Sequence, residues 1–224
     1  MSSGPAFLFD LDGTLVDSVY QHLLAWQEAL DLCGMPVSVW RIHRRIGMSG
    51  GLLANNLLRE TGREVTADEA DRLRRLHAEA FATHADRVRP LPGAIELLNH
   101  LSELRIPWAI ATSGERVGAA RVLAGLKVPD DVPIVTRDDV RYAKPDPDLF
   151  LAAAQRLGVD IGDCVVVGDS IWDMLAARRA RALGVGLLSG GYGTHELERA
   201  GAYRVYEDPA DLLLHADEVG VRTT

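Results

Sequence analysis

Two aspartates separated by one residue stand at the end of the first apolar run of the chain. The run Ala6 to Phe9 is followed at once by Asp10, and Asp12 comes two residues later. On an extended segment, side chains two residues apart point to the same side, so both carboxylates face one site. Two carboxylates this close repel each other unless a cation or a proton lies between them. The pair predicts a divalent metal site or two acids of different pKa, whereas a simple turn that ends the strand is the plainer alternative.

Hydroxyl groups follow a second apolar run, Trp108 to Ala111. Thr112, Ser113 and Gly114 end this run, and a helical pattern begins directly afterwards. Hydroxyls and backbone N–H groups at the start of a helix are suited to a phosphate oxygen. In most proteins, however, such residues serve only as a helix cap.

A lysine stands before a proline-rich turn. Lys144 precedes Pro145, Asp146 and Pro147. We expect Asp146 to cap a helix whose first residue is Pro147, and the prolines to restrict where the lysine lies. A lysine exposed to solvent in front of a helix is the simpler alternative.

A further acidic cluster follows the apolar run Cys164 to Val167. Asp169 stands at the end of this run, as Asp10 does at the end of the first, and is suited to an oxygen-ligand site for Mg²⁺. Ser170 and Asp173 have the spacing of a capping box, and we expect Asp173 both to cap the helix and to orient Lys144 or a metal-bound water. The four clusters supply a nucleophile, a second acid, a metal site, hydroxyl donors and a cation, which phosphoryl transfer requires.

The elements that must position these residues are short strands that alternate with helices. Apolar runs of strand length occupy residues 6–9, 108–111, 134–135, 164–167, 184–188 and 203–206, and helical patterns separate the later ones. This alternation predicts an α/β fold with right-handed crossovers and a parallel sheet covered on both faces. Ligands bind beyond the carboxyl ends of such strands, so the four polar clusters converge there.

One long interval breaks the alternation. Between the first strand and the Pro-rich segment before residue 94 the chain offers helical patterns without a convincing strand. Gly34 and Gly62 are placed to end helices, and Thr66 to Glu69 has the pattern of a capping box. We therefore predict an inserted helical cap at residues 17–86 and a core made of residues 1–16 and 87–224.

The composition of the chain disfavours nucleic acid and membrane as binding partners. The 24 Lys and Arg residues against 32 Asp and Glu residues give a formal net charge of −8, spread along the chain, which disfavours a nucleic-acid-binding surface. No run approaches the roughly 20 apolar residues of a membrane span. We expect a cytoplasmic monomer or weak homodimer that binds a small phosphorylated metabolite, and neither nucleic acid nor membrane.

Over nearly its whole length the chain resembles the haloacid dehalogenase-like superfamily, in particular its phosphatases with a helical cap, which include phosphoglycolate phosphatases and β-phosphoglucomutase-like proteins. The D-x-D-G-T motif of that family is similar to residues 10–14, its Thr or Ser motif to Thr112, its lysine to Lys144, and its acidic motif to residues 168–170 with Asp173. The resemblance implies a Rossmann-like parallel sheet core with helices on both faces, plus an inserted α-helical cap.

The resemblance also implies catalytic roles. Asp10 would attack phosphorus and form an aspartyl-phosphate, and Asp12 would protonate the leaving oxygen and then activate water. Mg²⁺ would be held by the carboxylates of Asp10 and Asp169 and by the backbone carbonyl of Asp12. The expected activity is a Mg²⁺-dependent hydrolysis of a small phosphomonoester.

The transferring phosphoryl group would be bound by two side chains, with help from the backbone. Thr112 and Lys144 are the residues that the resemblance assigns to this role, and the N–H groups of Ser113 and Gly114 would assist.

Two alternative functions differ from this expectation. A sugar-phosphate mutase resembles the chain at Asp12, His22 and Trp26, but the arginine of its cap motif G-x-S-R is missing from the segment Gly47-Met48-Ser49-Gly50. A non-catalytic module that only binds a phosphorylated ligand would be marked by loss of a catalytic carboxylate, and none is lost. We therefore rank the hydrolase first.

Substrate choice is expected to lie in the cap. His22 and Arg45 are the cap residues that we predict to contact the substrate, Arg45 as one of a basic group at residues 41–45. A solvated helix surface is the alternative for most of that group. Phosphoglycolate-like and sugar-phosphate substrates both remain open.

Overall fold

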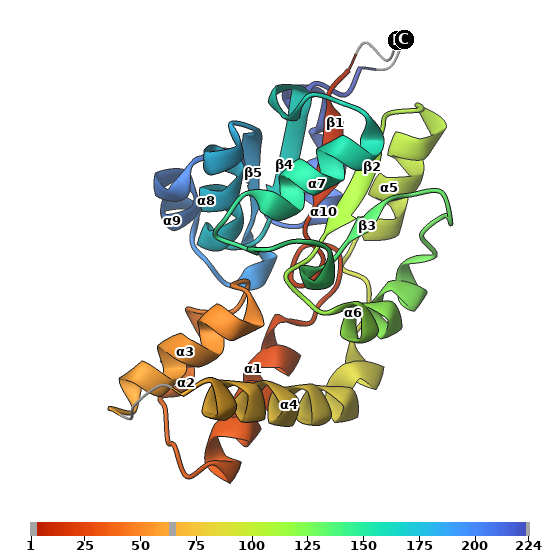
Figure 1. The fold of residues 1–224 in the computed structure, drawn as a ribbon. Helices are drawn as coiled ribbons and strands as arrows, with labels where there is room; N and C mark the ends of the chain where they lie inside the picture. The colour runs from red at the N-terminus through yellow and green to blue at the C-terminus, as the bar shows by residue number, and fades with distance from the viewer. Residues whose placement is uncertain (1–3, 63–65, 223–224) are drawn as a thin grey trace.

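Six parallel strands form the sheet of the core in a computed structural model that describes residues 4–62 and 66–222 (Figure 1). The strands are β1 (Ala6–Phe9), β2 (Trp108–Ala111), β3 (Ile134–Val135), β4 (Cys164–Gly168), β5 (Leu183–Leu187) and β6 (Ala202–Tyr206). Their order across the sheet is β3-β2-β1-β4-β5-β6, and all neighbours pair in parallel. The predicted α/β fold is confirmed.

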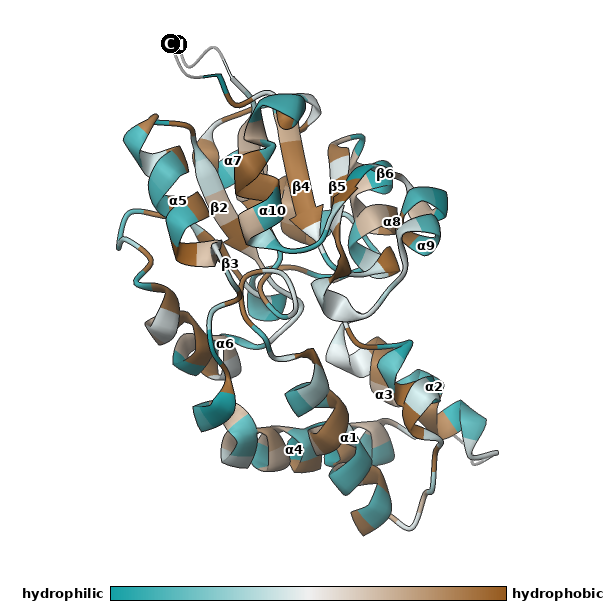
Figure 2. Ribbon diagram, turned by 180° about the vertical axis from the view of Figure 1, so that it is seen from behind, coloured by the Kyte–Doolittle hydropathy of each residue, from teal (hydrophilic) through white to brown (hydrophobic). Residues whose placement is uncertain are grey.

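The central strands are apolar on both sides because both faces of the sheet are covered. In β1, Phe7 and Phe9 belong to the core on one face, and Leu8 belongs to the core on the other. In β4, Val165 and Val166 divide between the two cores in the same way. Figure 2 shows β4 as hydrophobic along its length. Continuous apolar runs of this kind are typical of a buried parallel sheet.

Helices cover each face of this sheet. On the face of Phe7 lie α5 (Ala94–Glu103), α6 (Arg116–Leu123) and α10 (Pro209–Leu214), and on the face of Leu8 lie α7 (Asp148–Leu157) and α8 (Ile171–Ala180). Helix α9 (Thr194–Ala200) packs against α8 and β6. Single 3₁₀ turns occupy Ala85–Arg87, Ala124–Leu126, Arg137–Asp139, Ile161–Asp163, Leu188–Gly190 and Ala216–Val219.

Four helices follow β1 and form a separate layer at the carboxyl edge of the sheet (Figure 1). They are α1 (Val19–Leu32), α2 (Val39–His43), α3 (Gly50–Glu60) and α4 (Ala67–His84). Their apolar side chains, among them Leu30, Leu57 and Leu73, form a hydrophobic core of their own. The helical cap is present, and its exact division from the core at residues 17–86 stays a prediction.

The ends of the cap helices have the predicted capping residues and terminal glycines. The Thr66 hydroxyl accepts a hydrogen bond from the Glu69 N–H (3.2 Å) and donates one to the Glu69 carboxylate (3.1 Å) at the start of α4. Gly34 and Gly62, at the ends of α1 and α3, have positive φ angles of 62° and 72°. Because side chains strain this backbone region, glycine suits both positions.

The two chain segments that join cap and core lie side by side. Val16 pairs in an antiparallel bridge with Pro90, and the Asp17 N–H donates to the Arg89 carbonyl (2.9 Å). The outgoing and returning segments are therefore joined by hydrogen bonds where the chain passes between core and cap.

One helix start differs from its prediction. Helix α7 begins at Asp148 with Pro147 in the capping position, rather than at Pro147 with Asp146 as the cap. The Asp146 carboxylate is instead paired with Arg179 (3.2 Å) on α8.

Within residues 4–62 and 66–222, none of the helices combines the length and apolarity that crossing a membrane requires. The longest of those given above, α4, is also rich in charged side chains.

Candidate active site

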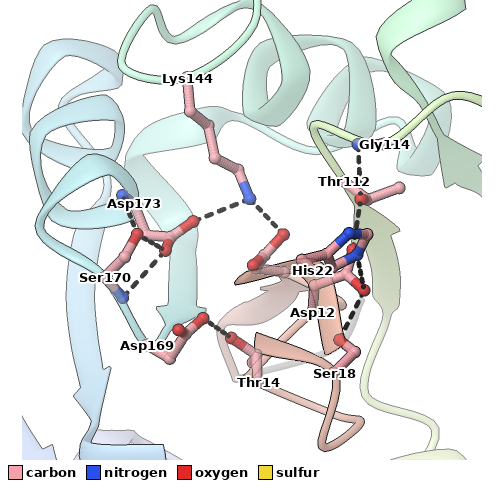
Figure 3. A network of polar contacts seen from close by, with 11 residues as sticks. Asp12, Thr14, Ser18, His22, Thr112, Gly114, Lys144, Asp169, Ser170 and Asp173 are labelled. Atoms are coloured by element: carbon pink, nitrogen blue, oxygen red, sulfur yellow. Dashed lines mark hydrogen bonds and ion pairs between the residues drawn. The ribbon is translucent and has the colours of Figure 1, made fainter. Parts of the chain in front are cut away.

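Functional side chains from three neighbouring strands meet at the carboxyl edge of the sheet (Figure 3). Asp10 follows β1, Thr112 follows β2 and Asp169 follows β4, and β1 lies between the other two. The chain runs from β1 outward through β2 and β3 and then returns to β4 on the opposite side. Such a reversal of strand order opens a crevice at which ligands bind in α/β sheets.

Lys144 is fully buried between two carboxylates. Its ammonium group is ion-paired with Asp10 and lies 2.8 Å from an Asp173 oxygen. Burial acts to lower the pKa of Lys144, but the charges of Asp10 and Asp173 outweigh it and raise that pKa above its ordinary value. The lysine therefore carries a positive charge at the centre of the site, and the alternative of a solvated lysine is wrong.

Opposing effects act on the pKa of Asp10. Burial raises the pKa of its carboxyl group to about 7, with Asp173 and Asp12 adding to the rise, while Lys144 opposes it. The ionised form of Asp10 thus depends on nearby positive charge. A group that brings further positive charge to this site favours the nucleophilic carboxylate.

Asp12 is held by donors from the start of the cap. Its Oδ1 atom accepts a hydrogen bond from the Ser18 hydroxyl (2.7 Å) and lies 3.2 Å from His22 Nε2, while its Oδ2 atom lies 3.4 Å from the Thr112 hydroxyl. Burial acts to raise the pKa of Asp12, but the charge and hydrogen bonds of His22 and Ser18 hold it below its usual value. The two aspartates of one motif therefore differ in acidity.

Three carboxylates gather where a cation would fit. Oxygens of Asp10, Asp169 and Asp173 all lie within 4.8 Å of one another, and all three residues are buried. Burial raises the pKa of Asp169 well above its ordinary value, and the charges of Asp173 and Asp10 add to the rise. Lys144 balances one of the three negative charges, so a divalent cation would neutralise the rest.

The side chain of Asp12 is not part of this acidic cluster, and a metal contact through its backbone carbonyl stays a prediction. Asp173 belongs to the cluster instead, although its oxygens are also engaged by Lys144 and by the backbone N–H of Ser170 (3.1 Å). The capping box of Ser170 and Asp173 at the start of α8 is confirmed, as is the contact of Asp173 with Lys144.

A cavity of about 350 Å³ opens between the core and the cap at this site. Asp10, Asp12 and Thr112 line its core side, and His22 and Trp26 line its cap side. Its volume lies at the lower end of the roughly 300–1,000 Å³ typical of small-molecule sites. The cavity therefore suits a small metabolite.

Two hydrogen-bonding groups that follow Thr112 differ in their availability to a phosphate. The Gly114 N–H donates to the Thr112 hydroxyl (2.9 Å), so it is already engaged. The Ser113 hydroxyl is buried at the cavity and has no hydrogen-bond partner among the described residues. A buried polar group without a partner is costly, so Ser113 offers a donor to a bound ligand.

A family model described as haloacid dehalogenase-like hydrolase matches residues 5–181. The chain belongs to this family.

Curated relatives of the chain are named as phosphatases and a mutase. Hexitol phosphatase A of Escherichia coli is 41% identical over 73% of this chain and 74% of the relative. A phosphoglycolate phosphatase of Rhodospirillum rubrum is 32% identical over 92% and 88%, and a β-phosphoglucomutase of Bacillus subtilis is 30% identical over 83% and 84%. The chain is a phosphatase of the haloacid dehalogenase-like family, whose members among these relatives act on small phosphorylated metabolites.

A solved structure has nearly the same fold. The crystal structure of a hydrolase from Pseudomonas syringae superposes with a TM-score of 0.94 at 57% sequence identity, covering 97% of this chain and all of that one. That hydrolase therefore shares the arrangement of cap and core described above.

The cap of this phosphatase is joined to the core on the side of α2. His43 Nε2 lies 2.9 Å from the Gly190 carbonyl, the Tyr192 hydroxyl donates to the Arg44 carbonyl (2.9 Å), and Arg44 is paired with Glu196 (2.6 Å). These contacts hold the cap over the carboxyl edge of the sheet, next to the cavity.

Arg45 does not reach the cavity. Its guanidinium is paired with Glu60 and donates to the Arg41 carbonyl (2.6 Å), both within the cap. It lines a separate hollow together with Arg44 and Trp172. Its predicted contact with the substrate has no support in this arrangement, whereas His22 does line the cavity.

The cavity is lined by basic residues that the sequence reasoning missed. Arg74 and His77 line it from α4, and Arg121 and Arg137 line it from the core. Arg74, His77 and Phe81 share one face of α4 by helical spacing, and this pattern was available in the sequence. The positions of Arg121 and Arg137 had no comparable local signal.

Proposed function

We propose that this chain is a Mg²⁺-dependent phosphomonoester hydrolase that acts on a phosphorylated sugar or sugar alcohol through an aspartyl-phosphate on Asp10. The observation that carries the proposal is the buried Asp10 beside Lys144, with Asp12 and Asp169 at the same edge of the sheet. A nucleophile, an acid of different pKa, a fixed cation and an acidic cluster are the groups that stepwise phosphoryl transfer uses.

In the first step, an Asp10 oxygen bonds to phosphorus and the bond from phosphorus to the leaving oxygen breaks. The electron pair goes to the leaving oxygen, which takes a proton from Asp12; because the pKa of Asp12 is low, this carboxylate must first gain that proton from solvent or from the incoming phosphate. Ser18 and His22 occupy Oδ1 of Asp12, so Oδ2, with only the long contact to Thr112, is the atom that transfers this proton. Asp12 leaves the step as a carboxylate.

In the second step, Asp12 removes a proton from water, and the resulting hydroxide attacks the phosphorus of the aspartyl-phosphate. The bond between phosphorus and Asp10 breaks, inorganic phosphate leaves, and Asp10 returns as a carboxylate. The low pKa that His22 and Ser18 give Asp12 favours the anionic form needed to begin this step.

The acidic cluster fits a divalent cation, with Asp10 and Asp169 as the side chains that would hold it. Mg²⁺ bound there would shield the negative charge that otherwise repels an incoming phosphate. Lys144 and the unpartnered hydroxyl of Ser113 would bind oxygens of the phosphoryl group. Lys144 is buried and held by Asp10 and Asp173, so it needs little rearrangement when phosphate arrives.

The choice of a sugar or sugar-alcohol phosphate is supported by the 41% identity to a hexitol phosphatase. A cavity that extends past Asp12 to Trp26 and to Arg74 leaves room for a leaving group of several carbons. Phosphoglycolate, the substrate named for a relative at 32% identity, is the compact alternative.

A sugar-phosphate mutase is the second candidate function, because of Arg74. A side chain at Gly50, where the mutase motif carries arginine, would meet the Arg74 side chain at 3.9 Å, so α4 brings a cation to that place. A hydrolase remains first, because Arg74 is already paired with Asp71.

The test measures inorganic phosphate released from a panel that includes hexitol, hexose and glycolate phosphates, with Mg²⁺ and with chelator. We expect chelator-sensitive release with a preference for a sugar or sugar-alcohol phosphate. Asp10→Asn should lower it about a thousandfold while the fold is kept, and Asp17→Asn, an exposed acid nearby, should not. Conversion of a hexose 1-phosphate to its 6-phosphate without hydrolysis would favour the mutase, and an active Asp10→Asn enzyme would contradict the covalent mechanism.

A further inference from the structure

Two histidines from different cap helices form a chain of contacts that leads to the catalytic acid, Asp12. His22, on α1, lies with its Nε2 atom 3.2 Å from Asp12 Oδ1. Its other ring nitrogen, Nδ1, lies 3.2 Å from Nε2 of His77 on α4. The chain of contacts therefore runs from α4 through α1 to the carboxylate that handles the proton.

Packing fixes both rings. His22 stacks on Phe81 with a centroid distance of 3.9 Å and an angle of 3° between the planes, and His77 stacks on Trp26 at 4.0 Å and 16°. Trp26 and Phe81 are themselves buried in the cap. Because neither ring is free to rotate away, the nitrogens of the two histidines face each other in a defined way.

The ring nitrogens can be assigned from this geometry. Burial and the neighbouring His22 lower the pKa of His77 well below its ordinary value, so His77 is neutral. If His22 is also neutral, the Asp12 carboxylate favours a proton on His22 Nε2, and His22 Nδ1 then accepts from His77 Nε2–H. If His22 is protonated, its Nδ1–H donates to His77, and Nε2 again carries a proton. In both cases His22 presents a donor to Asp12.

We propose that His77 is a positioning residue that acts through His22, keeping the Nε2 proton of His22 directed at Oδ1 of Asp12. The proposal rests on the function proposed above, in which Asp12 is the acid and then the base. Without His77, a neutral His22 can carry its proton on Nδ1 instead, and its Nε2 lone pair would then face the carboxylate. Asp12 would lose one of the two donors that hold Oδ1, and Oδ2 would be less well directed for proton transfer.

The kinetic test distinguishes the contribution of the His77 nitrogen from the contribution of its ring stacking. His77→Phe keeps a ring against Trp26 and removes both nitrogens, whereas His77→Gln removes the ring and keeps an N–H near the position of Nε2. We expect His77→Phe to lower kcat about tenfold with KM changed less than about twofold, and His77→Gln to retain most of kcat. The opposite order, with the Phe variant active and the Gln variant impaired, would show that only stacking matters and would overturn the proposal.

The chain offers a matched control on the same helix. His84 also joins α4 to α1, through Glu28 (2.9 Å), but it has no contact with Asp12. His84→Phe should therefore leave kcat within about twofold of the original enzyme. An equal loss of kcat in the His84 and His77 variants would mean that the packing of α1 against α4 is responsible, and would contradict the proposal.

A second measurement does not depend on turnover. Nitrogen-15 NMR of histidine-labelled protein reports which ring nitrogen of His22 carries a proton. We expect Nε2 to be protonated in the original chain and in His77→Gln, and a population protonated on Nδ1 alone to emerge in His77→Phe. An unchanged His22 spectrum in His77→Phe would overturn the proposal. If the original chain hydrolyses nothing, the proposed function fails, and this spectrum still decides whether His77 controls His22.

Discussion

At the scale of single residues, the closest packing in the site surrounds the Asp169 carboxylate. The Thr14 hydroxyl donates to one of its oxygens (3.0 Å). Two glycines lie so close to the other oxygen that they leave no room for a side chain. A side chain carbon at Gly190 would lie 1.8 Å from Asp169 Oδ2, and one at Gly13 would lie 2.4 Å from it. Both positions therefore admit only glycine while Asp169 keeps its place.

This crowding predicts the effect of a single methyl group. Gly190→Ala should displace Asp169 and lower Mg²⁺-dependent phosphate release at least about tenfold, because a metal-binding carboxylate tolerates little displacement. The measurement is phosphate release at several Mg²⁺ concentrations, with circular dichroism to check the fold. Gly193→Ala, in the same loop with its nearest neighbour at 3.7 Å, is the control. Full activity in Gly190→Ala would mean that Asp169 does not need this position.

Among the helices and strands, Asp139 connects three elements of the core. Its Oδ1 atom accepts from Arg116 on α6 (2.7 Å) and Arg156 on α7 (2.9 Å), and its Oδ2 atom accepts from the Thr136 N–H after β3 (2.8 Å). Although burial acts to raise it, hydrogen bonds from the N–H and hydroxyl of Thr136 and the hydrogen bond and charge of Arg156 lower the pKa of Asp139 to about 2. The carboxylate thus stabilises the folded core in its ionised form.

The sign of the pH dependence follows from that lowered pKa. A carboxyl group whose folded pKa lies below its unfolded value stabilises the fold at pH above the unfolded value, near 4, and this contribution is lost as the pH falls toward 2. Asp139→Asn should lower the free energy of unfolding by about 1 kcal/mol at pH 7, because solvent screens part of the interaction. Urea unfolding from pH 7 to pH 2 should show the difference shrinking below pH 4. A difference that grows in acid would contradict this account.

The stability of the long cap helix α4 depends on the capping hydrogen bonds at its first turn. Thr66 and Glu69 form hydrogen bonds with each other at this helix end, as described above. Ser38, at the start of α2, makes no capping hydrogen bond with its side chain. Thr66→Ala should lower stability by about 1 kcal/mol, and Ser38→Ala should change it much less. Thermal unfolding of both variants measures this. A similar loss in the two variants would mean that the Thr66 bond contributes little.

For the molecule as a whole, the acidic cluster links β1 with β4 and α8 across the centre of the sheet. Three buried carboxylates share one lysine, so their repulsion opposes folding when no divalent cation is present. A ligand that binds only the folded chain stabilises it by about 2.7 kcal/mol at a hundred times its Kd. Mg²⁺ binding should therefore be visible in the melting temperature.

We expect Mg²⁺ to raise the melting temperature of the original chain and chelator to reverse the rise. Asp169→Asn should melt no lower than the original chain without Mg²⁺, because it removes one repelling charge, and should lose the response to Mg²⁺. Differential scanning calorimetry provides the measurement. An undiminished response in Asp169→Asn would place the metal elsewhere.

The sequence by itself determined the parts of this protein that depend on local pattern. Apolar runs of strand length located all six strands, since a strand buried on both faces must be apolar throughout. Residues that follow such strands must lie at the carboxyl edge of a parallel sheet, so Asp10, Thr112 and Asp169 were brought together as predicted. Capping residues such as Thr66 were also recognisable, because a cap acts within one helical turn.

Only the tertiary structure decided which cap residues reach the cavity and how Lys144 is held. Helical spacing tells which side chains share a face, but not which face is turned toward the core. That choice depends on the packing of α1 against α4 and on the contacts of α2 with the core, and it directed Arg74 and His77 inward while Arg45 turned to Glu60. Lys144 is buried because Asp10 and Asp173, far from it in sequence, supply the charges that make burial of an ammonium group favourable.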